Sequence, residues 1–555
     1  MERETYSMTN RNYRWHNEAS QKFLEGGYLL KGQTLDERVS IICANAERIL
    51  EIPGFAEKFQ SYFKAGFYSF STPVWTNFGH RRGLPISCFG STIDDTMESI
   101  IDTWAEASTM TKYGGGTSAY FGHLRPRGAI IQDNGESAGP VHFMQAFDTL
   151  IKVVNQGSTR RGSFAAYMPI DHPDIMEFLN IKSEGNDIQD LSFGVTVPDS
   201  FMERMIEGDK KARKVWARVL EVRKNLGFPY IIFIDNANNA APEWYKGTIT
   251  HSNLCTEIFL PDTFTESFVC DLSSMNILHY DEWKDTDAVE MLVYFLDAVM
   301  SEFIEKARNI KHMQRAVRFA ENHRAIGIGW LGWHSYLQSR MIPFESMKAK
   351  LLNVEIAKNI NERATRASEG LAVLLGIPDF LRGKSRQRNG TLSAIAPTKS
   401  SAFILGQVSE GIEPARTNYD IKDLAKGKFS LKNPYLETLL ESKKKNTSTT
   451  WKSILSKGGS CQHLDFLDEE ERAVFKTMQE IPQRELVIQA AARQKYVDQG
   501  QSLNLMIHPS VPVKDINALM IEGWKLGIKS FYYQHSVNAA QEFSRKILEC
   551  SSCES

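Results

Sequence analysis

Three residues with reactive or polar side chains alternate along one short segment: Asn253, Cys255 and Glu257. In an extended chain, successive side chains point to opposite faces. An amide, a thiol and a carboxylate would then share one face, with Leu254 and Thr256 on the other. Taken alone, this pattern fits a reactive cluster and a buried strand cysteine flanked by surface polar groups equally well.

The chain has seven cysteines, an odd number spread over 555 residues, which does not suit a secreted disulfide scaffold. Cys550 and Cys553 form a CxxC pair so close to the end that little sequence remains to bury them. Half of a zinc site is the alternative, but such a site needs about four ligands, and the sequence has no second CxxC or HxxxH. The pair therefore indicates redox exchange.

Hydroxyl groups gather directly after Pro397, at Thr398, Ser400 and Ser401, ahead of an expected helix. Hydroxyls and backbone N–H groups at such a place suit a phosphate. An ordinary helix N-cap uses the same residues, and the residues alone favour the cap. Farther on, Tyr532 and Tyr533 are adjacent in an expected strand, an arrangement that usually gives one core ring and one surface ring.

Composition restricts the classes of function. Apolar residues make up 42% of the chain and charged residues 24%, with a formal net charge of −2. This profile is typical of a globular protein and provides no basic field for nucleic acid. The sequence shows no apolar run of membrane-spanning length and no secretory signal at its start. We therefore expect a cytoplasmic enzyme with neither a membrane nor a nucleic acid as partner.

The elements that must position these residues alternate between helix and strand. Residues 1–60 have helical periodicity, and the polar segment 441–450 predicts a solvated loop. Helices are expected at 96–112, 141–154, 287–309 and 345–376, and strands at 229–234, 255–260, 326–331 and 391–396. Such alternation predicts an α/β fold, either a barrel or a parallel sheet.

A series of short motifs, in order from residue 71 to residue 553, resembles the ribonucleotide reductases, and in particular the large catalytic subunit of class I enzymes. NLCTEI resembles the family's finger-loop pattern N-x-C-x-E. The other matching strings are LPISCF around Cys88, CDLSSMNIL from Cys270, HRAIGIGWLG (323–332), APTKSS (396–401), SEGIEP (409–414), DQGQSLN (498–504), WKLGIKSFYYQ (524–534) and the terminal cysteine pair.

The resemblance implies a chemical role for each cysteine of the set. Cys255 would become a transient thiyl radical that abstracts the ribose 3′-hydrogen. Glu257 would act as general base toward the 3′-hydroxyl, and Asn253 would orient the sugar. Cys88 and Cys270 would supply two electrons and finish as a disulfide, which requires their Cα atoms to lie within about 7 Å. The tail cysteines would re-reduce that pair by thiol–disulfide exchange. Cys43 and Cys461 match no motif, and we interpret both as structural.

The resemblance also implies the binding sites. Thr72, Ser87, Thr398, Ser400 and Ser401 would bind the nucleoside diphosphate substrate. Tyr532 and Tyr533 would relay a radical from a second subunit to the active-site cysteine. A deoxynucleoside triphosphate or ATP effector would bind elements that comprise Asp95, Arg125, Gln156 and one or both of Arg160 and Arg161.

The fold implied by the resemblance is a ten-stranded α/β barrel with a central finger loop. Residues 1–70 would form a helical region, 71–540 the barrel, and 541–555 a flexible redox tail. We expect a homodimer, no metal and no tightly bound cofactor on this chain, a small subunit that carries a dimetal or other radical cofactor, and thioredoxin or glutaredoxin as reductant. The first active-site cysteine is already at position 88, so we expect no N-terminal ATP-cone.

Two rival functions are compatible with parts of this pattern. A cobalamin-dependent reductase shares the finger loop and the tail, but the FYYQ string favours class I. A catalytically silent, nucleotide-binding regulator would have no use for the intact set of cysteines.

Overall fold

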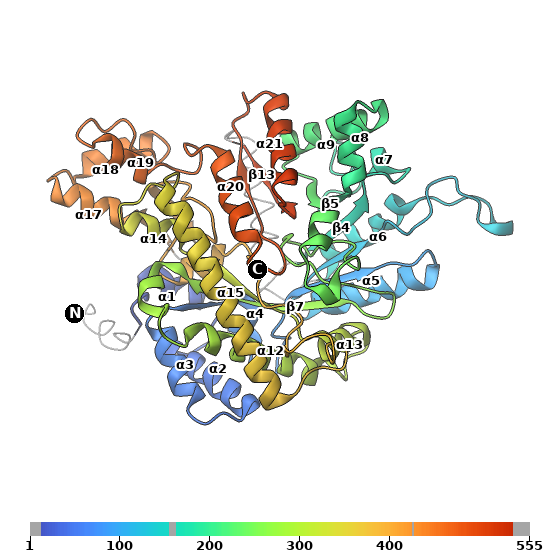
Figure 1. The fold of residues 1–555 in the computed structure, drawn as a ribbon, viewed down its shortest axis with the longest axis horizontal. Helices are drawn as coiled ribbons and strands as arrows, with labels where there is room; N and C mark the ends of the chain where they lie inside the picture. Colours follow the sequence, from blue (N-terminus) through green and yellow to red (C-terminus); the bar gives the residue numbers. More distant parts are fainter. Residues whose placement is uncertain (1–12, 155–161, 425–426, 537–555) are drawn as a thin grey trace.

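Five strands in the first half of the chain run parallel and form one side of a barrel. They are β2 (Cys88–Thr92), β3 (Gly116–Tyr120), β4 (Phe164–Pro169), β5 (Ser192–Val197) and β6 (Tyr230–Phe233), paired in that order. A computed structural model of the protein describes residues 13–154, 162–424 and 427–536, and Figure 1 shows their arrangement. Helices connect these strands, as a parallel sheet requires.

Five more segments, also parallel to one another, complete the barrel. They are β7 (Phe268–Asn276), β8 (Ile326–Leu331), residues 391–396, residues 501–506 with β11 (Leu505–Met506), and residues 530–535 with β12 (Ser530–Phe531) and β13 (Gln534–His535). The two halves meet at antiparallel seams, β2 with β7 and β6 with β12. Within the described residues, the expected ten-stranded barrel is therefore confirmed.

In the second half of the barrel, two pairs of neighbouring segments are connected by a single β-bridge each rather than by a full ladder of hydrogen bonds. Ile328 pairs with Ser393, and Ile395 pairs with Gln501. The sequence predicted a regular strand at 391–396, and the structure has an extended segment with these two bridges instead. β1 (Tyr68–Phe70) adds to the edge of β7 outside this circuit.

Helices cover the barrel and account for most of the remaining chain. The predicted helices at 96–112, 141–154, 287–309 and 345–376 are confirmed as α5, α6, α12 and α15. The bounds are α1 (Glu18–Glu25), α2 (Leu35–Leu50), α3 (Phe55–Lys64), α4 (Thr72–Asn77), α5 (Met97–Lys112), α6 (Pro140–Val153), α7 (Ile175–Phe178), α8 (Asp199–Glu207), α9 (Lys210–Leu226), α10 (Ile234–Asn239), α11 (Tyr280–Trp283), α12 (Ala288–Ala307), α13 (Gln314–His323), α14 (Trp333–Ser339), α15 (Met347–Leu375), α16 (Lys399–Ile404), α20 (Gln483–Gln494) and α21 (Val513–Lys525).

Helices α2 and α3 pack against α12 at the lower end of Figure 1, whereas α1 packs against α16. Val39, Ile42, Cys43 and Ala46 lie on the buried face of α2, in agreement with the helical periodicity of residues 1–60. Phe59 of α3 stacks on Phe295 of α12, with ring centroids 4.5 Å apart. An apolar interface thus joins α2 and α3 to the barrel.

Residues 419–475 form a lobe with its own apolar core, which the sequence did not reveal. It contains β9 (Tyr419–Leu424), β10 (Gly427–Lys432), α17 (Pro434–Ser442), α18 (Ser448–Ser456) and α19 (Glu469–Val474) around Trp451, Cys461 and Phe475. The prediction of a solvated loop over 441–450 is wrong at both ends. Helix α17 continues to Ser442, and α18 already begins at Ser448. Capping by Thr447, whose hydroxyl accepts the Thr450 N–H, allows α18 to start there.

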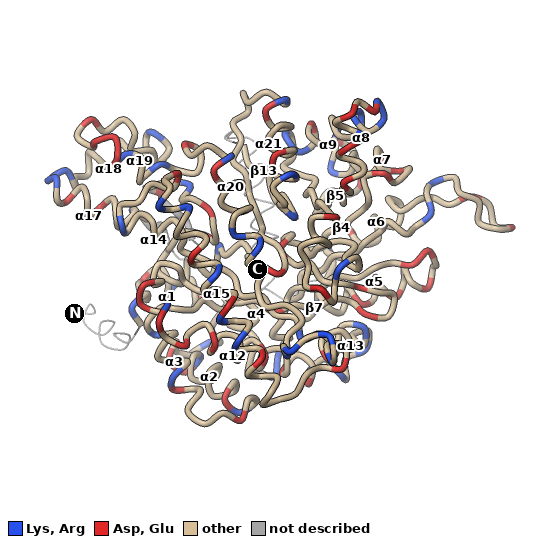
Figure 2. The backbone as a smooth tube through the Cα atoms, viewed as in Figure 1, with Lys and Arg blue, Asp and Glu red and all other residues tan. Residues whose placement is uncertain are grey.

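Among the described residues, positively and negatively charged positions are interspersed along the chain (Figure 2). Lysine and arginine residues alternate with aspartate and glutamate residues along the outer helices (Figure 2). Within the described residues, every helix is too short or too polar to cross a membrane.

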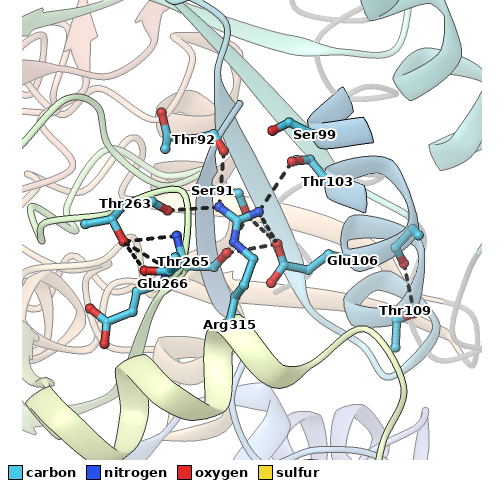
Figure 3. Close-up of polar contacts among 12 residues, drawn as sticks. Ser91, Thr92, Ser99, Thr103, Glu106, Thr109, Thr263, Thr265, Glu266 and Arg315 are labelled. Carbon is cyan, nitrogen blue, oxygen red and sulfur yellow. Dashed lines mark hydrogen bonds and ion pairs between the residues drawn. The ribbon is translucent and has the colours of Figure 1, made fainter. Parts of the chain in front are cut away.

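A buried polar cluster fastens the seam between β2 and β7. The Glu106 carboxylate of α5 accepts hydrogen bonds from Ser91 (3.0 Å) and Ser267 (2.8 Å), and it pairs with Arg315 of α13 (3.2 Å). Figure 3 shows Arg315 reaching between Glu106 and Thr263. Because Cys88 pairs with Cys270 in the seam, the same register places Ser91 opposite Ser267, three residues farther along. The cluster therefore fixes the register that brings the two cysteines together.

We expect Glu106→Ala to lower the free energy of unfolding by about 3 kcal/mol, because it leaves the mostly buried Arg315 without its counter-charge. Urea denaturation measures this loss. The control is Glu177→Ala, which breaks the exposed Arg127–Glu177 pair and should cost less than about 1 kcal/mol. Equal losses in the two variants would contradict a special role for the cluster.

Candidate active site

Residues 251–260 form a loop inside the barrel, and every one of them is buried. The strand predicted at 255–260 is wrong. The Asn253 side-chain oxygen accepts the backbone N–H groups of Glu257 and Ile258, both at 3.1 Å, and Thr256 has a φ of 66°. The segment is therefore a tight turn, and the strict alternation of faces inferred from period 2 does not apply. Cys255 lies within this turn.

The barrel wall supplies the remaining hydrogen bonds of the loop. Tyr167 donates to the Asn253 carbonyl (2.5 Å), Ser502 to the Cys255 carbonyl (2.6 Å) and Ser530 to the Thr256 carbonyl (2.9 Å). The Gly500 N–H donates to the Glu257 carbonyl at 2.7 Å. Gly500 permits this approach, because a Cβ there would lie 2.3 Å from the Phe259 ring.

Cys88 and Cys270 are direct partners across the antiparallel seam. Such partners have Cα atoms about 4.5–5.5 Å apart, which is within the reach of a disulfide. Both are reduced in this structure, with no disulfide between them. Cys88 is partly exposed, whereas Cys270 is fully buried, and burial raises its pKa well above the usual value.

Glu257 is a fully buried carboxyl group beside the cysteine of the loop. Burial raises its pKa to about 7, opposed by hydrogen bonds from its own backbone N–H, from Asn253 and from Ser502. The Ser502 hydroxyl lies 3.2 Å from the Glu257 carboxylate. A carboxyl group that titrates near neutrality suits proton transfer.

Tyr532 and Tyr533 are both buried, with 1% and 7% of their surface exposed, so the expectation of one surface ring is wrong. They lie between β12 and β13, where the chain passes from one strand pairing to the next and both rings can turn inward. Their ring centroids are 4.3 Å apart. The Tyr532 N–H donates to the Leu503 carbonyl, next to the Ser502 that bonds the cysteine loop. The tyrosine pair thus adjoins the wall of the cysteine site.

A pocket connects the predicted phosphate loop with the tyrosine pair. Its lining comprises Ala396, Pro397, Lys399, residues 410–413, Arg416, Ser502, Asn504, Tyr532, Tyr533 and His535. Thr398 occupies the N-cap position of α16, but its hydroxyl accepts the Gly411 N–H at 2.7 Å instead of capping the helix. Ser400 is buried, and Ser401 donates to the Phe70 carbonyl at 3.2 Å.

The other predicted substrate residues lie on neighbouring elements. Thr72 begins α4, and its hydroxyl lies 3.3 Å from that of Tyr28. Ser87 precedes β2, with its hydroxyl 3.9 Å from the Cys88 sulfur.

Several residues of this region were not singled out by the sequence reasoning. Asn504 donates to Glu413 and accepts the Tyr533 N–H at 3.1 Å. The Tyr230 ring lies 4.8 Å from that of Tyr532 and 5.2 Å from that of Tyr533. The motifs DQGQSLN and SEGIEP do contain Ser502, Asn504 and Glu413, whereas Tyr230 lies only in an expected strand.

The predicted effector elements lie beside the first turn of α5. Arg125 forms an ion pair with Asp95 at 2.7 Å, and its backbone N–H donates to the same carboxylate. Thr96 caps α5, and its hydroxyl accepts the Ser99 N–H. Gln156, Arg160, Arg161, Cys550 and Cys553 lie outside the described residues.

The raised pKa of Glu257 predicts a specific dependence of stability on pH. The folded-state pKa of about 7 exceeds the ordinary value of 4.5, so the folded protein retains the proton longer. The resulting stabilisation is complete below about pH 4.5 and is lost as the pH rises through 7. The Glu257→Gln side chain is neutral throughout. The stability of this variant relative to the wild type should therefore rise by up to about 3 kcal/mol between pH 5 and pH 8. Urea unfolding at both pH values measures the change, and a constant difference would contradict the burial of an ionisable Glu257.

Comparison with known proteins places this site in a family. The chain matches the family "Ribonucleotide reductase, barrel domain" over residues 86–211, 207–381 and 381–534. A Frog virus 3 ribonucleoside-diphosphate reductase large subunit is 36% identical over 533 residues, which are 90% of this chain and 93% of that protein. The large subunit of Invertebrate iridescent virus 3 is 33% identical, over 87% of this chain and 88% of its own length.

A solved structure gives the same result at higher similarity. The class Id ribonucleotide reductase alpha subunit of Actinobacillus ureae superposes with a TM-score of 0.91 at 49% sequence identity, over 98% of this chain and 100% of that one. With the family match over most of the barrel, this similarity shows that the chain belongs to the ribonucleotide reductase family, as a large catalytic subunit of class I.

Proposed function

We propose that this chain reduces ribonucleoside diphosphates to 2′-deoxyribonucleotides with Cys255 as the radical-bearing residue. The observation that carries the proposal is the placement of Cys255 on a fully buried loop inside a barrel whose seam pairs Cys88 with Cys270. A thiyl radical requires protection from solvent and a nearby supply of two electrons. The buried position of the loop supports the first requirement, and the Cys88–Cys270 pair supports the second.

The neighbouring residues have matching roles in the proposed reaction. Cys255 takes the 3′-hydrogen of the ribose, and Glu257 accepts the 3′-hydroxyl proton while Asn253 orients the sugar. Cys88 and Cys270 provide two electrons and a proton as the 2′-hydroxyl leaves as water, and they end as a disulfide. Cys550 and Cys553 then reduce that disulfide by thiol–disulfide exchange, and a thioredoxin or glutaredoxin reduces the tail cysteines again.

The pocket between the phosphate loop and the tyrosine pair is the proposed place for the substrate. Thr398, Ser400 and Ser401, with backbone N–H groups of the loop, would bind the diphosphate. Lys399 lines the pocket and adds positive charge. Thr72 and Ser87 would contact the substrate from α4 and from the start of β2.

Replacing Cys255 with Ser should abolish turnover while substrate binding stays near normal, because a hydroxyl cannot take the place of the thiyl radical. Product formation from each ribonucleoside diphosphate, with the small subunit present, measures turnover. The matched control is Cys461→Ser, a buried thiol in the 419–475 lobe, which should remain active. Multiple turnovers by Cys255→Ser would refute the assignment.

The radical would enter from a partner, a small subunit with a dimetal or other radical cofactor, through Tyr532 and Tyr533. The contact between the two rings and their position beside the cysteine site support this route. A cobalamin-dependent reductase would produce its radical next to Cys255 and would need no such relay.

Either Tyr→Phe change should reduce activity to background, because phenylalanine is not oxidised at accessible potentials. The stability loss should stay near 1 kcal/mol, the contribution of one hydroxyl hydrogen bond. Turnover assays and thermal unfolding measure the two effects. Tyr336→Phe, which removes a mostly buried hydroxyl bonded to Asp281, is the control and should keep its activity. Near-normal turnover in both relay variants would exclude the tyrosine route.

We also propose a homodimer that forms through α5 and brings the effector elements to its interface. Met97, Ile101 and Trp104 are 53%, 56% and 39% exposed, and their spacing puts them on one face of the helix. An exposed apolar stripe of this kind marks a protein interface. It begins directly after Asp95, so a deoxynucleoside triphosphate held by Asp95, Arg125, Gln156 and Arg160 or Arg161 would lie next to the partner chain.

Ile101→Lys should convert the dimer to monomer and abolish the effect of deoxynucleoside triphosphates on substrate choice. Light scattering during size-exclusion chromatography measures the mass with and without effector. Leu374→Lys, at a comparably exposed leucine near the end of α15, should leave the dimer intact. A dimer that persists in Ile101→Lys would place the interface elsewhere.

A further inference from the structure

The side chain of Gln499 lies between the buried redox cysteine and the finger loop. Gln499 is fully buried, and its amide nitrogen lies 3.4 Å from the Cys270 sulfur. The same nitrogen lies 3.0 Å from the Thr391 hydroxyl and 3.3 Å from the Ile326 carbonyl. The Phe259 N–H of the finger loop donates to the Gln499 side-chain oxygen at 3.1 Å. One amide thus contacts both a reacting sulfur and the loop that carries Cys255.

The hydrogen-bond partners fix which end of the amide faces the sulfur. A backbone N–H can only donate, so the Phe259 N–H must meet the oxygen of Gln499 and not its nitrogen. The nitrogen then faces Cys270, where it can donate. One of its hydrogens suits the Thr391 hydroxyl, and the other is shared between the Ile326 carbonyl and the Cys270 sulfur.

The hydrogen bond from the Gln499 amide stabilises a Cys270 thiolate more than a Cys270 thiol. A thiol sulfur is a weak acceptor, whereas a hydrogen bond to a charged group is about twice as strong as a neutral one. The site around Cys270 otherwise opposes negative charge, because burial and the neighbouring Asp271 both raise the pKa of this thiol and the Gln499 amide lowers it. The amide therefore favours the charged form in a place where little else does.

Cys88 and Cys270 also differ in their exposure to solvent. Cys88 is partly exposed, whereas none of the Cys270 surface is accessible. An external thiolate must therefore attack a Cys88–Cys270 disulfide at the Cys88 sulfur. A bond forms between the incoming sulfur and Cys88, the bond between Cys88 and Cys270 breaks, and the electron pair leaves on Cys270 as a thiolate.

We infer that Gln499 is a further catalytic residue, which stabilises the Cys270 thiolate as the leaving group when the Cys88–Cys270 disulfide is reduced. With a dithiol as reductant, its second thiolate then attacks the mixed disulfide at the sulfur of the reductant, and Cys88 is released. The dithiol ends as a disulfide, and the two protons that it loses restore the two protein thiols. Leaving-group stability controls the rate of such an exchange.

This inference rests on the proposed function, because it requires that Cys88 and Cys270 form a disulfide during turnover. Mass spectrometry of the wild-type holoenzyme after one turnover without reductant tests that requirement by itself. If this disulfide does not form, the proposed function fails. If it forms, the following measurements decide the role of Gln499 alone.

The central variant is Gln499→Met, which keeps the length of the side chain and removes the donor. We expect reduction of the preformed disulfide by dithiothreitol to be about tenfold or more slower than in the wild type. The first turnover of the pre-reduced enzyme is measured separately, because methionine also removes the acceptor of the Phe259 N–H and can disturb the finger loop. Reduction of the preformed disulfide does not involve Cys255, so its rate is the quantity that tests the inference. Quenched samples, alkylated and analysed by mass spectrometry, give both rates.

The matched control is Gln489→Met. Gln489 is also fully buried, accepts the Trp333 ring N–H and donates to the Phe344 carbonyl, so its loss disturbs the fold in a similar way. This variant should reduce its disulfide at the wild-type rate. Equal rates in Gln499→Met and the wild type would overturn the inference, and so would equal slowing in both glutamine variants.

A measurement on the unaltered enzyme keeps the inference testable if Gln499→Met does not fold. A monothiol such as 2-mercaptoethanol, added to the oxidised wild type and quenched early, should be found attached to Cys88 with Cys270 free. An adduct on Cys270 would show that Cys88 is the leaving group and would overturn the inference. Gln499→Leu then serves as the second variant without a donor, with the same expected slowing.

Discussion

A loop inside a barrel must have its backbone polar groups satisfied without water, and this constraint organises the active site. A buried N–H or carbonyl without a partner costs as much as a lost hydrogen bond. The barrel wall bonds the finger-loop backbone through the Gly500 N–H and through four side chains: Tyr167, Gln499, Ser502 and Ser530. These polar residues are buried, and that is why the segment 498–504 is polar although it lies in the centre of the molecule.

The same bonds connect the chemical groups to one another. Ser502 donates to the Cys255 carbonyl and also lies within hydrogen-bond distance of the Glu257 carboxylate, so the position of the thiol and that of the carboxyl group depend on one side chain. The strand that follows Ser502 pairs with the segment of Tyr532 and Tyr533. Positioning of this kind depends on rigid strands, which hold side chains more precisely than mobile loops do.

Burial determines the acid–base properties of the site. It raises the pKa of Glu257 to about 7 and makes the Cys270 thiol a weak acid. A carboxyl group near neutrality can both accept and return a proton, whereas a thiol of high pKa stays protonated until it is used. The barrel interior therefore adjusts the two groups in directions that suit their proposed roles, with few charged neighbours.

Much of the fold and of the site could be predicted from the sequence because the responsible signals are local. Helical periodicity located α5, α6, α12 and α15, and short runs rich in β-branched residues located β6 and β8. The motif order was sufficient to identify the family, and the barrel followed from the resemblance. The resemblance singled out Cys88, Cys255 and Cys270 among the seven cysteines of the chain.

Contacts between distant residues decided the remainder. The segment around Cys255 has the alternation of a strand, yet it turns, because the Asn253 side chain accepts two backbone N–H groups ahead of it and wall hydroxyls donate to three loop carbonyls. Both rings of Tyr532 and Tyr533 are buried, because the chain passes between two pairings there. The direct opposition of Cys88 and Cys270 depends on the register of a seam between strands far apart in sequence, and Gln499 meets Cys270 only when residues 229 positions apart are folded together. Local periodicity contains no information on such contacts, since their free energy arises only when the barrel closes.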